Sequence, residues 1–398
     1  MDIQFPGDFI WGCSTAAAQI ETASDHNWKG LQSRDGHIFD RTTDHEKRRD
    51  QDIEYIARFG QVYRCSVDWA RLQPAPFALF DEKVVAEYRS FFQQLNFMGI
   101  KVMLVLHHFS HPRWFEEAGA WLYEENINSY MDYVRQCTEN FTEYISYWNT
   151  FNEPNVYAMN AYLLGNFPPK KKNRFTAANR VLNNMEIAHK VAYHFIKEKD
   201  NSDQVGISVN TAWMQGKNLP GIVLAFLSSY WFHHPGKDFF EVADFIGISY
   251  YAYVPFKPFP ITEIDNPGKL EKLKIPHDRM WGYRPEGLGR AIRSFYKRYK
   301  KPVIITENGI CTEDPEKRIL AIRDYLRIIH QEIRNNIPVK GYFHWSAWDN
   351  FEWNLGPTYR FGLVHVDFDT MERSSTDAAT YFSAIVKNNG FNEKLKED

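Results

Sequence analysis

The sequence predicts an α/β protein built as a single (β/α)8 barrel, the TIM-barrel architecture, and three observations predict it. Eight short segments rich in β-branched and aromatic residues recur along the 398-residue chain, about 47 residues apart, which is enough for a strand, a helix and two loops. Each segment is apolar along most of its length, as expected of parallel strands covered on both faces. Helical patterns separate the segments, and no linker rich in proline, serine or glycine divides the chain.

The expected strands run in this order: Phe9 to Ala16, Val62 to Trp69, Lys101 to His108, Tyr147 to Glu153, Val205 to Ala212, Phe245 to Tyr251, Pro302 to Asn308 and Val339 to Trp348. Between them, apolar residues at helical spacing predict helices over Val84 to Met98 and over Ile319 to Asn335. The proline-rich connection from Val254 to Pro285 is expected at the C-terminal face of the barrel, where this fold builds its active sites. Residues 1–398 are therefore expected to form one domain, with a polar tail that frays from about Lys387.

A doubly wound parallel sheet is the alternative architecture. It would need a Gly-x-Gly-x-x-Gly turn after an early strand to hold a phosphate group. The turn Trp11-Gly-Cys-Ser14 lacks that pattern, so the barrel is favoured.

The composition is that of a globular protein with many aromatic residues. Hydrophobic residues make up 44% of the chain and charged residues 24%, which argues against a disordered or collagen-like chain. Aromatic residues reach 16%, and their flat apolar faces are typical of surfaces that stack ligands such as sugars. The formal net charge of -3 gives no electrostatic reason to expect nucleic acid or an anionic membrane as a partner.

Cysteine usage and the first residues indicate the compartment. The 4 cysteines are too sparse for a disulfide framework and show no Cys-x-x-Cys spacing for zinc or redox chemistry, so reduced thiols are expected. Met1 to Trp11 does not combine a charged segment with a following apolar one, as a signal peptide does, and a cytoplasmic location is expected. The longest aliphatic run, Val102 to Leu106, falls far short of the roughly 20 residues of a membrane helix.

Two predicted strands end in a glutamate, and these glutamates are the clearest functional signal in the sequence. Glu153 ends the fourth strand and Glu307 lies at the end of the seventh. A carboxylate at a crowded barrel rim is costly to remove from water, so it usually serves chemistry or pairs with a base. Either glutamate alone is equally compatible with a structural ion pair.

Two carboxylates that face each other across a sugar-sized cleft can cleave a glycosidic bond. One donates a proton to the leaving oxygen while the other acts at the anomeric carbon. A separation of about 5 to 5.5 Å would retain the configuration, and a separation of about 6.5 to 9.5 Å would invert it. The residues by themselves leave both outcomes open.

At these residues the chain resembles glycoside hydrolase family 1, the β-glucosidase-like enzymes, nearly from end to end. The matching motifs are Phe5 to Gly12 with Ala18 to Glu21, Thr150 to Pro154, Ile305 to Gly309 and Trp345 to Trp353. The resemblance implies a (β/α)8 barrel, retention of configuration, no metal and no cofactor. It also implies that Glu153 is the acid/base and Glu307 the nucleophile.

The resemblance further implies a set of supporting residues. Arg64 and Tyr251 match residues that hold the nucleophile, through a fixed positive charge and a hydroxyl donor. Asn152 matches a residue that binds the sugar 2-hydroxyl, and it is also expected to orient Glu307. The residues that match contacts to the sugar or the aglycone are Gln19, His108, Asn152, Trp345, Glu352, Trp353 and Trp281.

Two positions depart from the family pattern. Phe109 stands where many relatives carry tryptophan, and it keeps a stacking face but loses an N–H donor. Ser249 stands where the family usually has asparagine, and its single hydroxyl cannot reproduce the hydrogen bonds of an amide, so modestly lower turnover is expected. A zinc site is not expected, because the adjacent His107 and His108 point to opposite faces of a strand.

These observations predict a retaining exo-β-glycosidase, in the first place a β-glucosidase, that acts on small β-glycosides or oligosaccharides through a covalent glycosyl-enzyme. Transglycosylation is expected when an alcohol replaces water. A sugar-binding protein with weak catalysis is one alternative, and only the departures at Ser249 and Phe109 support it. A 6-phospho-β-glycosidase is the other: the Glu352 carboxylate would repel a 6-phosphate, whereas Arg360 keeps a phosphate contact open.

Overall fold

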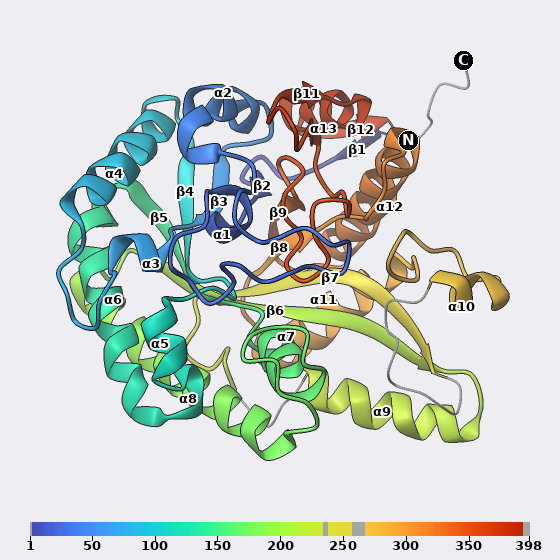
Figure 1. The fold of residues 1–398 in the computed structure, drawn as a ribbon. Coiled ribbons are helices and arrows are strands. Elements are labelled where there is room, and N and C mark those ends of the chain that lie inside the picture. The colour runs from blue at the N-terminus through green and yellow to red at the C-terminus, as the bar shows by residue number, and fades with distance from the viewer. Residues whose placement is uncertain (1, 234–237, 257–266, 393–398) are drawn as a thin grey trace.

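Eight parallel strands close into a barrel in the computed structural model, which describes residues 2–233, 238–256 and 267–392 (Figure 1). The barrel strands, neighbours in space in this order, are β2 (Ile10–Ser14), β3 (Val62–Ser66), β4 (Lys101–His107), β5 (Ile145–Asn152), β6 (Gln204–Gly216), β7 (Phe245–Phe256), β8 (Val303–Asn308) and β9 (Val339–Trp345). β2 also pairs with β9, which closes the ring. The predicted (β/α)8 barrel is confirmed.

Helices surround the barrel and connect its strands (Figure 1). They are α1 (Ala17–Ile20), α2 (His45–Arg58), α3 (Trp69–Leu72), α4 (Glu82–Phe97), α5 (Arg113–Glu117), α6 (Ile127–Phe141), α7 (Pro154–Ala158), α8 (Phe175–Lys199), α9 (Leu219–His233), α10 (Pro267–Lys272), α11 (Glu286–Tyr299), α12 (Pro315–Arg334) and α13 (Asp377–Asn388). Single turns are η1 (Ala120–Leu122), η2 (Glu124–Asn126), η3 (Thr142–Tyr144) and η4 (Met159–Leu163). Within the described ranges, no helix is long and apolar enough to cross a membrane.

Two element boundaries follow capping residues rather than apolar spacing. β3 ends at Ser66, before the predicted Trp69, because the Asp68 side chain accepts hydrogen bonds from two backbone N–H groups and starts α3. α12 starts earlier than predicted, at Pro315, because Asp314 caps its first turn in the same way and proline suits the first helical position.

The strands β6 and β7 are longer than predicted. They continue to Gly216 and Phe256 and remain paired to those last residues. Figure 1 shows the pair running out of the barrel beside α9. The connection predicted from Val254 to Pro285 therefore starts only after Phe256, and its residues 257–266 lie outside the described part of the chain.

The barrel interior has an apolar layer below a polar one. The apolar layer is one cluster with members from several strands: Val62, Met103, Phe245, Ile304 and Phe343. Side chains two residues apart on a strand share a face, and Arg64 follows Val62 on β3 as a fully buried cation. The polar groups of the interior therefore gather at the C-terminal ends of the strands.

The expectation of a frayed tail from Lys387 is wrong for residues 387–392. Lys387 lies in the last turn of α13, and the strand β12 (Gly390–Asn392) pairs antiparallel with β1 (Asp2–Gln4). The side chain of Asn389 explains the order, since its Oδ1 accepts a 2.8 Å hydrogen bond from the Trp11 indole and its Nδ2 donates to the carbonyl of Phe5. The rest of the predicted tail, residues 393–398, lies outside the described residues.

A second small sheet completes the described strands. β10 (Val364–Val366) and β11 (Arg373–Ser375) pair antiparallel, after the last barrel strand. Arg373 in β11 is buried and forms an ion pair with Asp52 of α2 at 2.8 Å, so the contact fastens this sheet to the first long helix.

Candidate active site

The two strand-end glutamates line one cavity at the C-terminal end of the barrel. Glu153 follows the last residue of β5, Glu307 is the penultimate residue of β8, and the two residues are 5% and 3% exposed. The other residues singled out from the sequence that line this cavity are His108, Phe109, Tyr251, Trp281, Trp345, Glu352 and Trp353. The structure therefore brings together side chains from both halves of the chain.

The carboxylate of Glu307 is held from both sides. Arg64 Nη1 donates to its Oε1 at 2.6 Å, and the Tyr251 hydroxyl donates to its Oε2 at 2.8 Å. Burial raises the pKa of Glu307, and the hydrogen bonds from Arg64 and Tyr251 oppose that rise because they favour the charged form. This carboxylate is fixed in orientation and is the one of the pair that has a cationic partner.

Glu153 has a different environment. Its Oε1 accepts a 2.8 Å hydrogen bond from the amide of Asn210 on β6. Burial, together with the negative charge of nearby Glu307, raises the pKa of Glu153 well above its ordinary value. Since the pKa of Glu153 is raised and Glu307 has a cationic partner, Glu153 can hold a proton while Glu307 stays ionised.

Asn210 is a site residue that the sequence analysis missed. It lies within a predicted strand, Val205 to Ala212, and the only signal for it was a polar side chain in an apolar run. The side-chain amide of Asn210 supplies a donor to Glu153. Ser249, which replaces the expected asparagine on β7, is fully buried and has no amide to offer. The amide that bonds Glu153 thus comes from β6.

A chain of hydrogen bonds extends from Glu307 through Arg64 and Asn152 to His108. Arg64 Nη2 donates to Asn152 Oδ1 at 2.6 Å, and Asn152 Nδ2 donates to His108 Nε2 at 2.9 Å. Burial and the Arg64 charge lower the pKa of His108 well below its usual range, so its ring is neutral and carries its proton on Nδ1. That buried Nδ1 has no hydrogen-bond partner among the described residues.

Asn152 reaches Glu307 only indirectly, and its contact to the sugar 2-hydroxyl stays a prediction. Its contacts to Arg64 and His108 leave it fully buried, so its influence on Glu307 passes through Arg64 rather than through a direct contact. Neither Arg64 nor Asn152 belongs to the residues that line the cavity.

Gln19 and Glu352 form a polar pair next to the aromatic residues of the cavity. Gln19 Nε2 donates to Glu352 Oε2 at 3.1 Å, and its buried Oε1 accepts no hydrogen bond from the described residues. Burial raises the pKa of Glu352 to about 8, against the lowering effect of hydrogen bonds from Gln19 and Trp345. Trp345 and Trp353 line the same cavity, so this region offers polar groups and flat apolar faces together.

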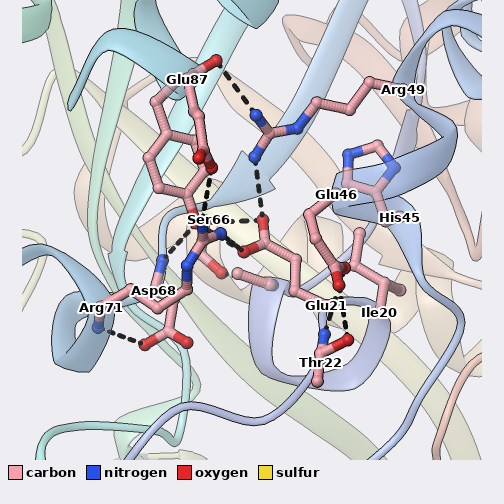
Figure 2. A network of polar contacts seen from close by, with 12 residues as sticks. Ile20, Glu21, Thr22, His45, Glu46, Arg49, Ser66, Asp68, Arg71 and Glu87 are labelled. Carbon is pink, nitrogen blue, oxygen red and sulfur yellow. Dashed lines mark hydrogen bonds and ion pairs between the residues drawn. The ribbon is translucent and has the colours of Figure 1, made fainter. Parts of the chain in front are cut away.

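The segment that carries Gln19 is anchored by a buried ionic network (Figure 2). Glu21, two residues after Gln19, accepts hydrogen bonds from Arg71 at 2.9 Å and from the Tyr88 hydroxyl at 2.8 Å. Arg71 also bonds Glu87 at 2.5 Å. The network ties the segment after β2 to α3 and α4, and it was missed because its partners are far apart in the sequence.

Three non-glycine residues that line the cavity have left-handed backbone conformations. Their φ angles are 45° for Glu153, 61° for Phe109 and 41° for Trp353. Such conformations cost energy for residues with a Cβ atom and concentrate at functional sites. Phe109 packs edge-on against Trp353 with ring centroids 5.3 Å apart, so the aromatic residue that departs from the family pattern still belongs to the aromatic lining.

His107 and Arg360 point away from the glutamates. His107 contacts the indole of Trp121 at 3.2 Å and His111 at 3.2 Å, whereas its neighbour His108 faces the cavity. Arg360 Nη1 donates to the carboxylate of Asp349 at 2.7 Å, and Arg360 is not among the lining residues of the cavity.

Comparison with known proteins places this geometry in a family. Residues 1–222 and 236–391 match the sequence model of glycosyl hydrolase family 1. The chain is 30% identical to β-glucosidase A of Acetivibrio thermocellus, over 98% of this chain and 99% of that protein. It is also 29% identical to a 6-phospho-β-galactosidase of Streptococcus equi subsp. zooepidemicus, over 96% of this chain and 98% of that protein.

Solved structures show the same likeness. A β-glucosidase from Thermotoga maritima in complex with castanospermine superimposes with a TM-score of 0.89 at 26% identity, covering 98% of this chain and 100% of the other. A β-glycosidase from Pyrococcus horikoshii superimposes with a TM-score of 0.86 at 29% identity, covering 98% and 97%. The likeness extends over the whole barrel.

Proposed function

Because this chain belongs to glycosyl hydrolase family 1, we propose that it is a retaining β-glucosidase that removes the terminal non-reducing sugar of neutral β-glycosides. The observation that carries the proposal is the unequal environment of the two cavity glutamates. Glu307 is fixed by Arg64 and Tyr251, whereas Glu153 is buried with a raised pKa and one amide donor. These are the environments that a nucleophile and an acid/base need.

In the first step, a Glu307 oxygen attacks the anomeric carbon and the bond from that carbon to the leaving oxygen breaks. Glu153 gives its proton to the leaving oxygen, so an alcohol departs and a glycosyl ester on Glu307 remains. The positive charge of Arg64 and the Tyr251 hydroxyl keep Glu307 ionised and aimed before the attack. We assign contacts to the sugar hydroxyls to His108 Nδ1, which has no partner among the described residues, and to Gln19, which bonds the lining residue Glu352 but does not itself line the cavity.

In the second step, Glu153 acts as a base toward water. Once Glu307 is esterified, its negative charge is gone, and the charge repulsion that helped to raise the pKa of Glu153 disappears. Glu153 then takes a proton from the incoming water, whose oxygen attacks the anomeric carbon and breaks the ester. The sugar leaves with its configuration retained after two inversions, and an alcohol in place of water gives a new glycoside.

We assign the enzyme to unphosphorylated sugars although one relative is named a 6-phospho-β-galactosidase. Glu352 offers no positive charge in either protonation state, and its neighbour Gln19 is neutral. Arg360, the cation that left a phosphate contact open, is bonded to Asp349. Arg34, the cation among the lining residues, donates to Asn166, and a phosphate dianion beside Glu352 would be repelled by that carboxylate.

The test is hydrolysis of p-nitrophenyl β-glucoside, β-galactoside, β-fucoside, β-mannoside and 6-phospho-β-glucoside by the wild type and two isosteric variants. Glu307→Gln is expected to abolish turnover. Glu153→Gln is expected to slow substrates with poor leaving groups by about 10² to 10⁴, and to slow 2,4-dinitrophenyl glucoside much less. Retention is tested by NMR of the first-formed anomer.

Full activity of Glu307→Gln would refute the assignment of the nucleophile. Preference for the 6-phospho substrate would refute the assignment to neutral sugars. If the folded wild type binds glucosides without cleaving any of them, the alternative of a sugar-binding protein replaces the proposal.

A further inference from the structure

One wall of the active-site cavity, next to Glu153, is apolar. Six side chains from both arms of the β6–β7 extension and from nearby segments pack together there and line the cavity, and we call them the apolar wall: Val156, Met159, Met214, Phe232, Val254 and Trp281. Val156 in α7 and Met159 in η4 lie three and six residues after Glu153 in the chain. Since Glu153 protonates the leaving oxygen, the apolar wall lies on the side where the leaving group departs.

The extension of β6 and β7 supplies this wall through strand alternation. Met214 pairs with Val254, and Ala212 pairs with Ala252 two residues earlier, so these positions share one face. The intervening Trp213 packs on the other side, against a different apolar cluster. The wall is therefore a consequence of the two strands continuing past the rim of the barrel.

Asn155 links the helix α9 to the strand β6 next to Glu153. Its Nδ2 donates to the carbonyl of Phe232 in α9 at 3.0 Å and to the carbonyl of Asn210 at 2.9 Å. Asn210 is the residue that bonds Glu153. The side-chain amide of Asn155 therefore positions both Asn210, which bonds Glu153, and Phe232, whose ring belongs to the apolar wall.

The apolar wall offers little to the hydroxyls of a second sugar. Val156, Met159, Met214, Val254 and Trp281 are only partly buried, so they keep apolar surface that a ligand can remove from water. Two of the lining amides are already bonded to the protein, since Asn160 donates to the carbonyl of Val156 and Asn210 donates to Glu153. The other charged or amide side chains of the lining, outside the glutamates and His108, are Arg34, Asn166 and Asn354, and none of them belongs to the apolar cluster that forms the wall. A polar leaving group there would lose hydrogen bonds to water without replacement.

We propose that the preferred leaving group is an apolar chain, such as a linear alkyl alcohol, and not a second sugar. The inference rests on the proposed function and names its substrate class. The sugar binds between Gln19, His108 and the tryptophans, and the alkyl chain lies along the apolar wall, with Met214 and Val254 in contact with its methylenes.

The experiment is a series of methyl, butyl, hexyl and octyl β-glucosides, assayed by release of glucose below the micelle concentration, with cellobiose alongside. The leaving alcohols have nearly equal acidity, so differences in kcat/KM report binding along the wall. We expect kcat/KM to rise by up to about fourfold for each methylene that contacts the wall. Octyl β-glucoside is expected to exceed cellobiose in kcat/KM by at least about tenfold.

Two variants locate the effect. Met214→Gln places an amide on the wall, and Val254→Thr replaces a methyl group with a hydroxyl at nearly constant shape; both are expected to lower the octyl-to-methyl ratio of kcat/KM, the first by about tenfold or more. Met98→Gln is the matched control, because Met98 is half exposed at the end of α4 and outside the cavity. The control is expected to keep the wild-type ratio.

The outcomes separate the two proposals. A flat series, a cellobiose value above that of octyl β-glucoside, or unchanged ratios in both wall variants overturns the apolar leaving group and leaves the β-glucosidase standing. Failure to cleave any glucoside, including the p-nitrophenyl glucoside, refutes the proposed function and the inference with it.

Discussion

Tyr251→Phe tests how Glu307, the proposed nucleophile, is kept ionised. The substitution deletes the hydroxyl that donates to Glu307 Oε2 at 2.8 Å and leaves the ring of Tyr251 in place. A hydrogen bond to a charged group contributes about 1.5 to 3 kcal/mol, which corresponds to about 10- to 150-fold in kcat/KM and to about one to two pKa units. Arg64 remains as the second partner of Glu307, so activity is expected to fall without being abolished.

The direction of the pH effect follows from the protonation state that the hydroxyl favours. The donor stabilises the ionised carboxylate and lowers the pKa of Glu307. Its loss therefore raises that pKa, and the acidic limb of the kcat/KM profile should move to higher pH. The assay is hydrolysis of p-nitrophenyl β-glucoside between about pH 4 and pH 9.

Tyr250→Phe is the matched control for this measurement. The neighbouring hydroxyl of Tyr250 donates at 2.7 Å to the carbonyl of Arg284 and does not touch the glutamates. Its loss is expected to cost about 1 kcal/mol of folding stability and to leave the pH profile where it was. An unmoved acidic limb in Tyr251→Phe, with kcat/KM within about twofold of the wild type, would refute the reasoning.

Three further perturbations probe other contacts. Asn210→Ala removes the donor that favours ionised Glu153, so the pKa of Glu153 rises and the alkaline limb of kcat/KM should move up by about one unit; an unmoved limb contradicts this. Glu21→Gln weakens the network of Figure 2 and should lower the free energy of unfolding by about 2 kcal/mol and raise KM, measured by urea denaturation and kinetics; unchanged stability contradicts it. Arg373→Met removes the guanidinium from buried Asp52, leaves it with the imidazole of His45 and should cost about 3 to 5 kcal/mol in the same denaturation. Lys340→Ala, which breaks an exposed pair with Asp8, should cost less than about 1 kcal/mol; equal losses would contradict the role of burial.

Much of the barrel could be predicted because each strand is a short apolar run that is visible in the local sequence. Runs such as Lys101 to His108 are apolar along most of their length, and the observed β4 differs from that prediction by its last residue. Helix starts were harder, since α12 begins where Asp314 caps it and not where its apolar spacing begins. Local composition predicts that an element exists better than it predicts where the element stops.

The site residues also divide into those that the local sequence indicates and those that only the folded structure reveals. Glu153 and Glu307 could be singled out because a charged residue at the end of an apolar strand is visible in the sequence. The donor Asn210 and the anchor Glu21 were not identified, because each acts on a partner far along the chain and nothing around it signals the partner. The amide that bonds Glu153 comes from Asn210 on β6, whereas the sequence directed attention to Ser249 on β7.

The sequence by itself determined the fold class, the pair of glutamates and the family, because these depend on residue types in short runs that keep their meaning wherever the chain goes. The tertiary structure alone decided that Asn210, 57 positions after Glu153, bonds that carboxylate, and that the extended strands and α9 build an apolar wall beside it. Such contacts form only when the barrel closes. Closure determines both how deeply each glutamate is buried and which charged or polar groups lie next to it. The difference in environment between two chemically identical glutamates is therefore a property of the folded chain.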